Sequence, residues 1–344
     1  MKKVVIIGGG FAGALAARKL EDSFAVTLID AKDYFEFTPS ILRTLIEPGH
    51  YKKIEVLHRR YLHQAQVVDE IVESFDSQAV VTKTKKYPYD YLIIATGSRY
   101  NLPIKAENMV LAARARELKN YAQKLAKAES VLIIGGGIVG VELAAEIIEA
   151  FPDKKITIIH AHSELIERNP RKARDYARQF LEKRGVKLIF NELVVEFKEQ
   201  NYKTDKNNLF KPDLAFFCTG IKPNYQLLVP YCAGSLNERK AVEVNNYLQV
   251  KGFKNIFAAG DITAIKEEKL AQGAEKQAKV VVKNIINLDC GRTLKEYRVK
   301  KLPMVISLGK WRGIFIKDNV VVTGIIPGIL KTLIEWKTMW KFRR

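Results

Sequence analysis

The distribution of apolar and polar residues along the chain repeats once. Residues 3–20 and 130–147 each begin with a short β-branched and leucine-rich run, pass through three glycines, and continue with small and apolar residues at helical spacing. Further along each half, residues 91–98 and 214–221 form another apolar run that ends in a Thr-Gly pair. Runs of this length bounded by glycine are typical of buried strands, and the spacing that follows indicates a helix. The pattern predicts two strand–turn–helix units of α/β class.

The C-terminal segment shows a single helical period instead. Wound as a helix, it gathers most of its apolar side chains on one side, namely Ile325, Ile326, Ile329, Leu330, Leu333, Ile334, Trp336 and Trp340. The opposite side carries Lys331, Thr332, Glu335, Thr338 and Lys341. This pattern predicts an amphipathic helix lying in a membrane interface, with Pro327-Gly328 at its entry. A helix packed on the enzyme or on a twin subunit stays open as the alternative, and so does a homodimer.

The charge balance narrows the choice of partners. The chain has 344 residues, and Lys plus Arg exceed Asp plus Glu by 19. Such an excess predicts an anionic partner: nucleic acid, an anionic lipid surface or phosphate-bearing cofactors. No apolar run is long enough to predict a transmembrane helix. The three cysteines stand apart at Cys218, Cys232 and Cys290, so neither a metal site nor a redox dithiol is predicted.

The glycines give the repeated units a chemical meaning. In each unit the first glycine permits a tight turn, the second lets a pyrophosphate approach the backbone, and the third lets helix and strand pack closely. These positions are Gly8, Gly10 and Gly13 in the first unit and Gly135, Gly137 and Gly140 in the second. The phosphates would lie on free N–H groups at each helix N-terminus. The sequence therefore predicts two Rossmann-like domains that bind dinucleotides.

The ends of the second strands differ between the two units. In the first unit this strand ends at Asp30, which suits the hydroxyls of an adenosine ribose. In the second unit it ends at His160, with His162 and Arg168 nearby and no carboxylate at the strand end. A neutral or cationic group there tolerates a 2′-phosphate, so we expect both NADH and NADPH to be used. The alternative is that His160 only packs.

Taken together, these motifs resemble the flavoproteins with two dinucleotide-binding domains, in which one Rossmann domain holds FAD and an inserted one holds NAD(P)H. The stretches that carry the resemblance are GGGFAG, YDYLIIATGS, GGGIVGVE, DLAFFCTGIKPN and NIFAAGDITA. Within that group the chain is most similar to type II NADH:quinone reductases and to the apoptosis-inducing-factor-like quinone reductases that suppress ferroptosis. The resemblance covers nearly the whole chain.

The resemblance implies a set of cofactor-binding residues. For FAD and the nicotinamide nucleotide it adds Gly9, Phe11, Ala12, Arg43, Val67, Thr96, Gly97, Gly220, Gly260 and Asp261 to the residues given above. Arg43 corresponds to a cofactor-contacting arginine, and the backbone of Val67 to a position beside adenine. Asp261 corresponds to the residue that binds the ribityl and phosphate region of FAD.

The resemblance also implies catalytic residues. Glu142 corresponds to a carboxylate near the nicotinamide and flavin that relays protons to the reduced quinone. Gln272 and Gln277 correspond to a stretch that opens a helix under the flavin, beside the quinone tunnel. For the glutamines the alternative is a polar helix start that only supports FAD, and for Glu142 it is a structural carboxylate. Disulfide reductases of this fold use a cysteine pair, which is missing here, so electrons would leave FAD directly.

Three functions compete on these grounds. The first is a membrane-associated NAD(P)H:quinone oxidoreductase, peripheral on a cytoplasmic face, that passes electrons to ubiquinone or menaquinone without pumping protons. The second is a soluble reductase of a ferredoxin or rubredoxin, and the third is a basic, flavin-containing nucleic-acid-binding protein. The motifs, the missing dithiol and the tryptophans of the tail favour the first, in which no nucleic acid is bound. Lys337, inside the apolar arc, would either snorkel to lipid phosphate or point to the quinone mouth.

The expected domains follow the repeat. FAD binding is assigned to residues 1–106 and 240–300, and NAD(P)H binding to an inserted domain at 107–239. Residues 301–344 are expected to form a short strand region and the amphipathic helix.

Overall fold

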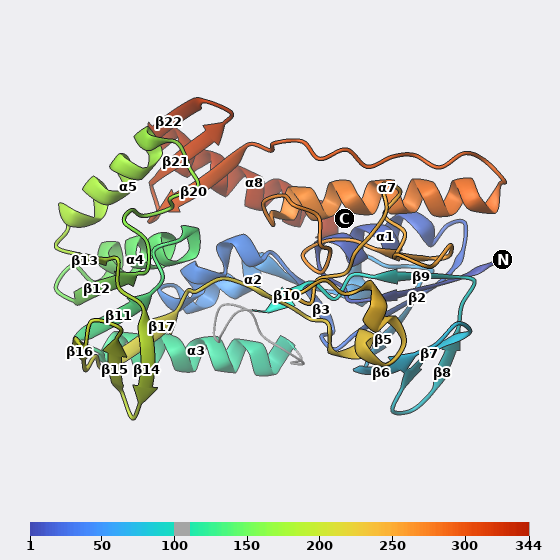
Figure 1. Cartoon of the computed structure of the whole chain (residues 1–344), viewed down its shortest axis with the longest axis horizontal. Helices are drawn as coiled ribbons and strands as arrows, with labels where there is room; N and C mark the ends of the chain where they lie inside the picture. Colours follow the sequence, from blue (N-terminus) through green and yellow to red (C-terminus); the bar gives the residue numbers. More distant parts are fainter. Residues whose placement is uncertain (100–110, 344) are drawn as a thin grey trace.

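A computed structural model describes residues 1–99 and 111–343 of the chain. Its first half is built on a five-stranded sheet in the order β19-β9-β1-β2-β5, in which all neighbours run parallel. The strands are β1 (Lys3–Ile7), β2 (Ala25–Asp30), β5 (Gln66–Asp69), β9 (Tyr91–Ile94) and β19 (Ile256–Ala258). Helices α1 (Phe11–Leu20) and α7 (Ala271–Asp289) lie side by side over one face (Figure 1). Side chains that include Val72, Phe75 and Leu228 pack on the other face. Since both faces are covered, the central strands are apolar throughout.

The second half repeats this plan on a smaller sheet. Four parallel strands take the order β13-β12-β11-β17. They are β11 (Ser130–Ile134), β12 (Lys155–His160), β13 (Lys187–Phe190) and β17 (Leu214–Phe217), flanked by α3 (Leu111–Lys127), α4 (Ile138–Ala150) and α5 (Arg171–Glu182). The prediction of two α/β units with parallel sheets is confirmed.

Smaller elements fill the remaining connections. The first half also contains β3 (Tyr34–Glu36), η1 (Thr38–Leu45), η2 (Pro48–His50), α2 (Tyr51–Ile54), β4 (Glu55–Leu57), η3 (His58–Arg60), β6 (Val72–Phe75), β7 (Ala79–Thr82) and β8 (Lys86–Pro88). The second half adds β14 (Val194–Lys198), β15 (Asn201–Thr204) and β16 (Leu209–Phe210). The segment that follows β17 returns to the first half, where η4 (Gln226–Leu228), α6 (Val229–Cys232) and η5 (Ala233–Ser235) lie against the five-stranded sheet. Strands β10 (Ser98–Arg99) and β18 (Lys222–Pro223) pair antiparallel where the chain passes between the halves. The predicted boundary at 106–107 lies outside the described residues, and the other domain limits stay predictions.

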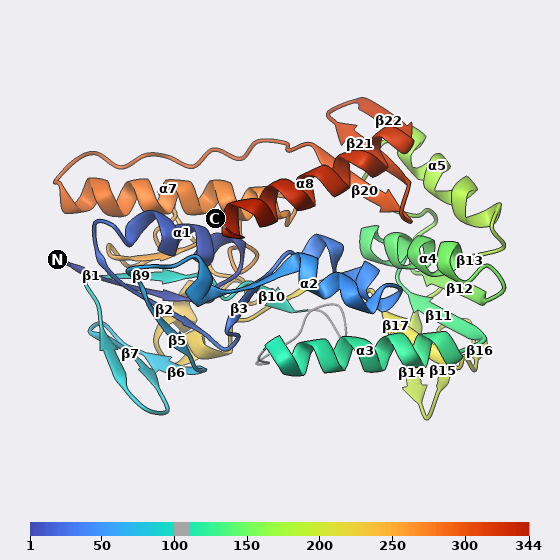
Figure 2. The same cartoon turned by 180° about the vertical axis from the view of Figure 1, so that it is seen from behind.

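The C-terminal segment forms a third sheet and a long helix. Strands β20 (Met304–Leu308), β21 (Arg312–Lys317) and β22 (Val320–Gly324) pair antiparallel, and α8 (Ile325–Arg343) follows directly. Helix α8 crosses from this sheet to the C-terminus beside α1, as both views show (Figures 1 and 2). It begins two residues before Pro327, so Pro327-Gly328 lies within its first turn and does not precede it; a proline fits there because the first N–H groups of a helix need no partner. Within residues 1–99 and 111–343, no helix combines the length and apolarity needed to cross a membrane.

A buried pair of carboxyl groups lies between β3 and β4. Glu36 and Glu55 are directly opposite each other in this antiparallel pair, and both are buried. Like charges at such positions repel. The fully buried Arg114 guanidinium donates to Glu36 at 3.1 Å, while burial and the Glu36 charge raise the pKa of Glu55 to about 8. At neutral pH the Glu55 carboxyl group is therefore mostly protonated.

This pair predicts a pH dependence of stability. Because the pKa of Glu55 is higher in the folded chain than in the unfolded chain, its contribution to stability is greatest below the unfolded value and is lost as pH rises to about 8. We expect Glu55→Gln, which cannot ionise, to raise the melting temperature relative to wild type above pH 8 and to change it much less near the unfolded pKa of about 4.3. Thermal unfolding across this pH range, followed by circular dichroism, measures the difference. An offset between the two proteins that does not vary with pH would contradict the assignment.

Candidate functional site

The carboxyl ends of both parallel sheets open into one cavity of about 2530 Å³. Its walls include both glycine turns and the ends of the second strands, as predicted for parallel α/β sheets. Single small-molecule pockets usually measure about 300–1,000 Å³, so this cavity has room for two extended ligands. The predicted site residues that line it are Gly8, Gly9, Gly10, Phe11, Ala12, Asp30, Thr96, Gly97, Gly135, Gly137, Glu142, His160, Gly220, Gly260 and Asp261.

The glycines of each turn divide into two kinds. A Cβ atom at Gly13 would lie 1.8 Å from the Gly8 carbonyl oxygen, so this position permits helix and strand to touch. A Cβ atom at Gly10 would meet nothing within 4 Å. The second turn repeats the arrangement, with 1.9 Å at Gly140 and open space at Gly137. Gly10 and Gly137 therefore precede helices α1 and α4 with nothing from the protein opposite them, as a pyrophosphate-binding turn requires.

Asp30 is held toward the first turn by its neighbours. Its Oδ2 accepts the Gly9 N–H at 2.8 Å and lies 3.2 Å from Nε2 of His58, whose Nδ1 is 2.6 Å from the Tyr61 hydroxyl. A neutral His58 satisfies both contacts by donating from Nε2 and accepting at Nδ1. Burial alone would raise the pKa of Asp30, but the His58 hydrogen bond and the charge of Lys32 bring it below the usual value. The carboxylate is therefore charged where a ribose would lie.

The first Thr-Gly turn is bonded to the segment that follows β18, and the Gly260-Asp261 turn is held by contacts within the first half. Thr96 and Asn224 exchange two hydrogen bonds, of 3.0 Å from the threonine hydroxyl and 2.8 Å from the asparagine amide. Ser98 donates to Asp261 at 2.6 Å. The Gly260 N–H donates to the side-chain oxygen of Gln277 at 2.7 Å. These contacts fix the backbone that faces the cavity from both sides.

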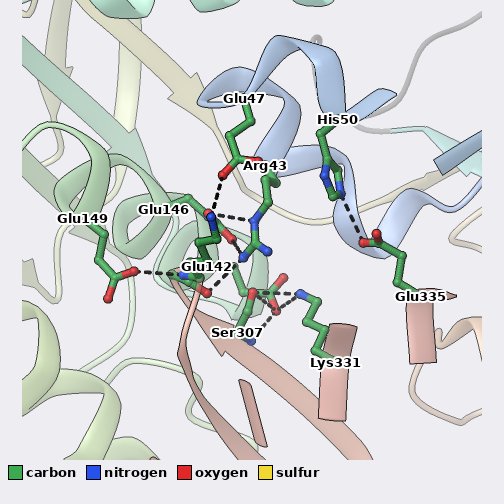
Figure 3. Close-up of polar contacts among 11 residues, drawn as sticks. Arg43, Glu47, His50, Glu142, Glu146, Glu149, Ser307, Lys331 and Glu335 are labelled. Atoms are coloured by element: carbon green, nitrogen blue, oxygen red, sulfur yellow. Dashed lines mark hydrogen bonds and ion pairs between the residues drawn. The ribbon is translucent and has the colours of Figure 1, made fainter. Parts of the chain in front are cut away.

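Helix α4 carries three carboxylates on the side that faces the C-terminal sheet (Figure 3). Glu142 accepts the Ser307 N–H at 2.7 Å, the Ser307 hydroxyl at 3.0 Å and the Lys331 ammonium at 2.7 Å. It is buried and also lines the cavity. Lys331 belongs to α8, on the side that the sequence pattern assigns to polar residues. A side chain of the C-terminal helix thus reaches the wall of the nucleotide cavity.

Six predicted residues lie outside the lining that the described residues form. These are Gly13, Arg43, Val67, Gly140, Gln272 and Gln277. Both third glycines have the packing role expected of them. Val67 pairs with Leu28 within the first sheet. Their parts in binding or catalysis stay predictions.

Arg43 and the two glutamines have protein partners. The Arg43 guanidinium donates to Glu146 at 2.7 and 3.3 Å and to the Gly309 carbonyl at 3.1 Å. Gln277 is buried, accepts from Gly260 and donates to Glu267 at 2.6 Å, so it supports the Gly260-Asp261 turn. Gln272 donates to the Pro303 carbonyl at 3.4 Å. The arrangement of Gln277 matches the supporting role that the sequence left open.

The structure adds residues that the sequence did not indicate. His58 orients Asp30, Ser307 and Lys331 bind Glu142, and Glu167 lies beside His160 with 3.3 Å between its Oε2 and Nε2. These residues have no fixed spacing from the motifs they contact. Within the described part of the chain, no group of three or more His, Cys, Asp or Glu side chains could hold a metal ion.

The residues at the first turn fit FAD. Open space at Gly10, a charged Asp30 and the Gly260-Asp261 turn lie around one cavity, which is the donor and acceptor set that a pyrophosphate and a ribose need. The family profile described as pyridine nucleotide-disulphide oxidoreductase matches residues 2–278. The chain belongs to this family. It is a flavoprotein oxidoreductase that binds FAD and uses NAD(P)H.

Individual relatives agree with this assignment. Ferroptosis suppressor protein 1 of Taeniopygia guttata is 31% identical over 360 residues, covering 98% of this chain and 95% of the relative. Among solved structures, NDH2 of Plasmodium falciparum in complex with NADH matches with a TM-score of 0.86 and 16% identity, covering 99% and 96% of the two chains. The sulfide:quinone oxidoreductase of Aquifex aeolicus matches with a TM-score of 0.83 and 22% identity, covering 100% and 92%. The two solved structures show the same fold.

The two kinds of glycine predict two kinds of defect. Gly13→Ala forces a methyl group against the Gly8 carbonyl and should lower stability by about 1–3 kcal/mol. Gly10→Ala meets no protein atom, so the melting temperature of the flavin-free chain should stay near wild type while FAD affinity falls by about tenfold, equivalent to 1.4 kcal/mol. Thermal unfolding and titration with FAD separate the two effects. Equal loss of stability in both variants would contradict the division.

Proposed function

We propose that this protein is an NAD(P)H:quinone oxidoreductase that works at the surface of a membrane and does not pump protons. One observation carries the proposal: helix α8 connects the nucleotide cavity to an exposed apolar surface. Lys331 on its inner side contacts Glu142 in the cavity wall. Its outer side exposes Ile326, Leu333 and Trp336 by 73%, 55% and 64%. A lipid-borne acceptor at this helix would therefore lie close to the nucleotide cavity.

The inner side of α8 is fixed by polar and aromatic contacts. Glu335 lies 3.1 Å from Nε2 of His50, and Arg343 donates to the carbonyls of Lys52 and Lys53. Near the end of the helix, the Phe342 ring stacks on the Phe35 ring of the first half, with 4.1 Å between centroids. An apolar stripe usually turns toward a protein core. Here the ion pairs of Lys331 and Glu335 dock the inner side of the helix together with the buried Met339 and Phe342, and most of the apolar stripe faces outward while Ile334 packs partly against the core.

The outer surface of α8 has the composition of a membrane-interface helix. Trp336 and Trp340 are both exposed, and their rings stack with centroids 6.3 Å apart. Tryptophan is enriched at the depth of lipid headgroups. Lys337 is exposed beside Trp336, which favours snorkelling to lipid phosphate over a position at the quinone mouth. With the excess of 19 basic residues, this favours an anionic lipid surface and a peripheral location, which we place on a cytoplasmic face.

The chemistry asks little of the protein beyond placement and one proton. When bound, FAD supplies the hydride acceptor for the nicotinamide and the electron donor for the second substrate. Reduction of a quinone to a quinol consumes two electrons and two protons. NAD(P)H supplies both electrons and one of the protons as a hydride, so the second proton must come from water through a group beside the acceptor. Glu142, in the cavity wall and bound to Lys331, is placed to hold and deliver it.

Acceptor specificity tests the proposal. The purified flavoprotein should oxidise NADH with a soluble ubiquinone or menaquinone analogue, and much more slowly with ferredoxin or rubredoxin. Glu142→Gln should slow quinone turnover by about a hundredfold, the lower end of what a positioned proton donor contributes. Turnover with ferricyanide, which takes electrons without protons, should change far less.

The matched control for this experiment is Glu146→Gln. It breaks a comparable ion pair on the same helix, but Glu146 does not line the cavity. Its ratio of quinone to ferricyanide turnover should equal that of wild type. If ferredoxin is reduced faster than any quinone, the proposed quinone acceptor is wrong and the acceptor is a protein. If Glu142→Gln keeps the wild-type ratio of quinone to ferricyanide turnover, Glu142 does not deliver the proton.

Membrane binding is tested through the outer surface of α8. The double variant Trp336→Ser/Trp340→Ser should no longer sediment with vesicles of phosphatidylcholine and phosphatidylglycerol in equal parts. Its NADH:ferricyanide turnover should stay normal, because neither side chain lines the cavity. Phe197→Ser, at an equally exposed ring on β14, is the control and should bind vesicles like wild type. Full sedimentation of the double variant would argue that α8 is covered by protein.

A further inference from the structure

The second nucleotide turn has a carboxylate at a place where the sequence shows none. Strand β12 ends at His160, but the Glu167 carboxylate lies beside it in the cavity wall. Its Oε2 is 3.3 Å from Nε2 of His160, and its Oε1 is 3.9 Å from Nε2 of His162. Glu167 follows the strand end by seven residues, so spacing from the glycine motif does not reveal it.

Comparison with the first nucleotide turn indicates which part of a bound nucleotide the Glu167 carboxylate would face. In the first half, a Cβ atom on the middle glycine, Gly9, would lie 2.6 Å from Oδ2 of Asp30. In the second half, a Cβ atom on Gly136 would lie 2.9 Å from the ring of His160. His160 therefore occupies the position of Asp30 against its own glycine turn. The Glu167 carboxylate contacts Nε2 of that ring. It therefore lies on the same cavity wall, farther from Gly136 by the width of the His160 side chain.

The backbone around Glu167 is held against the glycine turn. The Ile166 N–H donates to the Gly136 carbonyl at 2.9 Å, and the Asn169 N–H donates to the Ile166 carbonyl at 2.9 Å. Ile166 is buried and has a φ of 43°. A β-branched residue adopts this conformation only where its surroundings impose it. The loop is thus fixed to the turn immediately before Glu167.

The charges at this end of the cavity disfavour a phosphate. Partial burial alone would raise the pKa of Glu167, but the hydrogen bonds it receives from its own backbone and from His160 bring that pKa below the usual value; burial lowers the pKa of His160. At neutral pH the carboxylate is charged and the imidazole is neutral. Glu192, also in the lining, adds a second carboxylate, which is buried and accepts from the Asn208 amide at 3.0 Å. Arg168 is an exposed cation beside them.

We propose that Glu167 accepts the hydrogen bonds of the adenosine ribose hydroxyls of the nicotinamide nucleotide and makes this protein prefer NADH over NADPH. A ribose with free hydroxyls donates to a carboxylate, whereas a 2′-phosphate is repelled by it. The proposal replaces the dual use that the strand end alone indicates. It rests on the nicotinamide-dependent half of the proposed function and is independent of the electron acceptor.

Binding of the oxidised nucleotides tests this without turnover. In calorimetric titrations of the flavin-loaded protein, NAD⁺ should bind at least about tenfold more tightly than NADP⁺, a difference of about 1.4 kcal/mol. Glu167→Gln should weaken NAD⁺ binding, strengthen NADP⁺ binding and reduce the ratio to about one. Retained melting temperature and flavin absorbance show that the variant is folded. The rates at which NADH and NADPH bleach the flavin without any quinone should change in parallel.

Two control variants decide between a specific contact and general charge. Glu164→Gln removes the same charge three residues away, where the carboxylate pairs with Arg174 and does not line the cavity. It should keep the wild-type ratio, and Arg168→Met should keep the NAD⁺ preference. Equal affinities in wild type, or the same loss of ratio in Glu164→Gln, would overturn the proposal. If the protein prefers NAD⁺ but reduces no quinone, the proposed electron acceptor is wrong, while the proposed role of Glu167 still holds.

Discussion

Three carboxylates on helix α4 bind partners from the first half and from the C-terminal segment. Glu142 holds Ser307 and Lys331 of the C-terminal segment, Glu146 holds Arg43 of the first half, and Glu149 accepts the Lys310 N–H at 2.8 Å. Removing one partner of a buried pair usually costs about 3–5 kcal/mol, because the remaining charge stays buried. Since α4 also begins at the second glycine turn, these contacts relate the nucleotide cavity to the C-terminal sheet and to α8. The geometry of the site therefore depends on them.

The two nucleotide turns show how one backbone plan serves two ligands. Their glycines approach the neighbouring carbonyls at almost the same distances, so backbone packing is duplicated. The side chains at the ends of the second strands are not. In the first turn His58 supports an aspartate at the strand end, and in the second a histidine at the strand end supports Glu167. Relative to the first turn, the histidine and the carboxylate are interchanged in the second turn, where the carboxylate belongs to a loop residue.

Helix α8 reverses the usual relation between an amphipathic helix and its protein. Its polar side is docked through Lys331 and Glu335, and its last turn is anchored by Phe342. Most of the apolar side is left exposed by the described chain, although Ile334 packs partly against the core. Docking by ion pairs makes this arrangement stable without hiding the surface that would meet lipid. It also brings a charged side chain from the exposed helix to the cavity wall.

The sequence by itself determined the features that depend on local pattern. The two parallel sheets, the glycine turns, Asp30 and the amphipathic character of α8 follow from strand and helix periodicity and from the steric needs of glycine. The direction in which α8 faces did not follow, because periodicity defines two sides of a helix and not which side is docked. The partners of Arg43, Gln277 and Glu142 lie far away in the chain, so no spacing rule identifies them. The position of the Glu167 carboxylate likewise depends on the tertiary structure, because the buried Ile166, in a left-handed backbone conformation, sets the course of its loop.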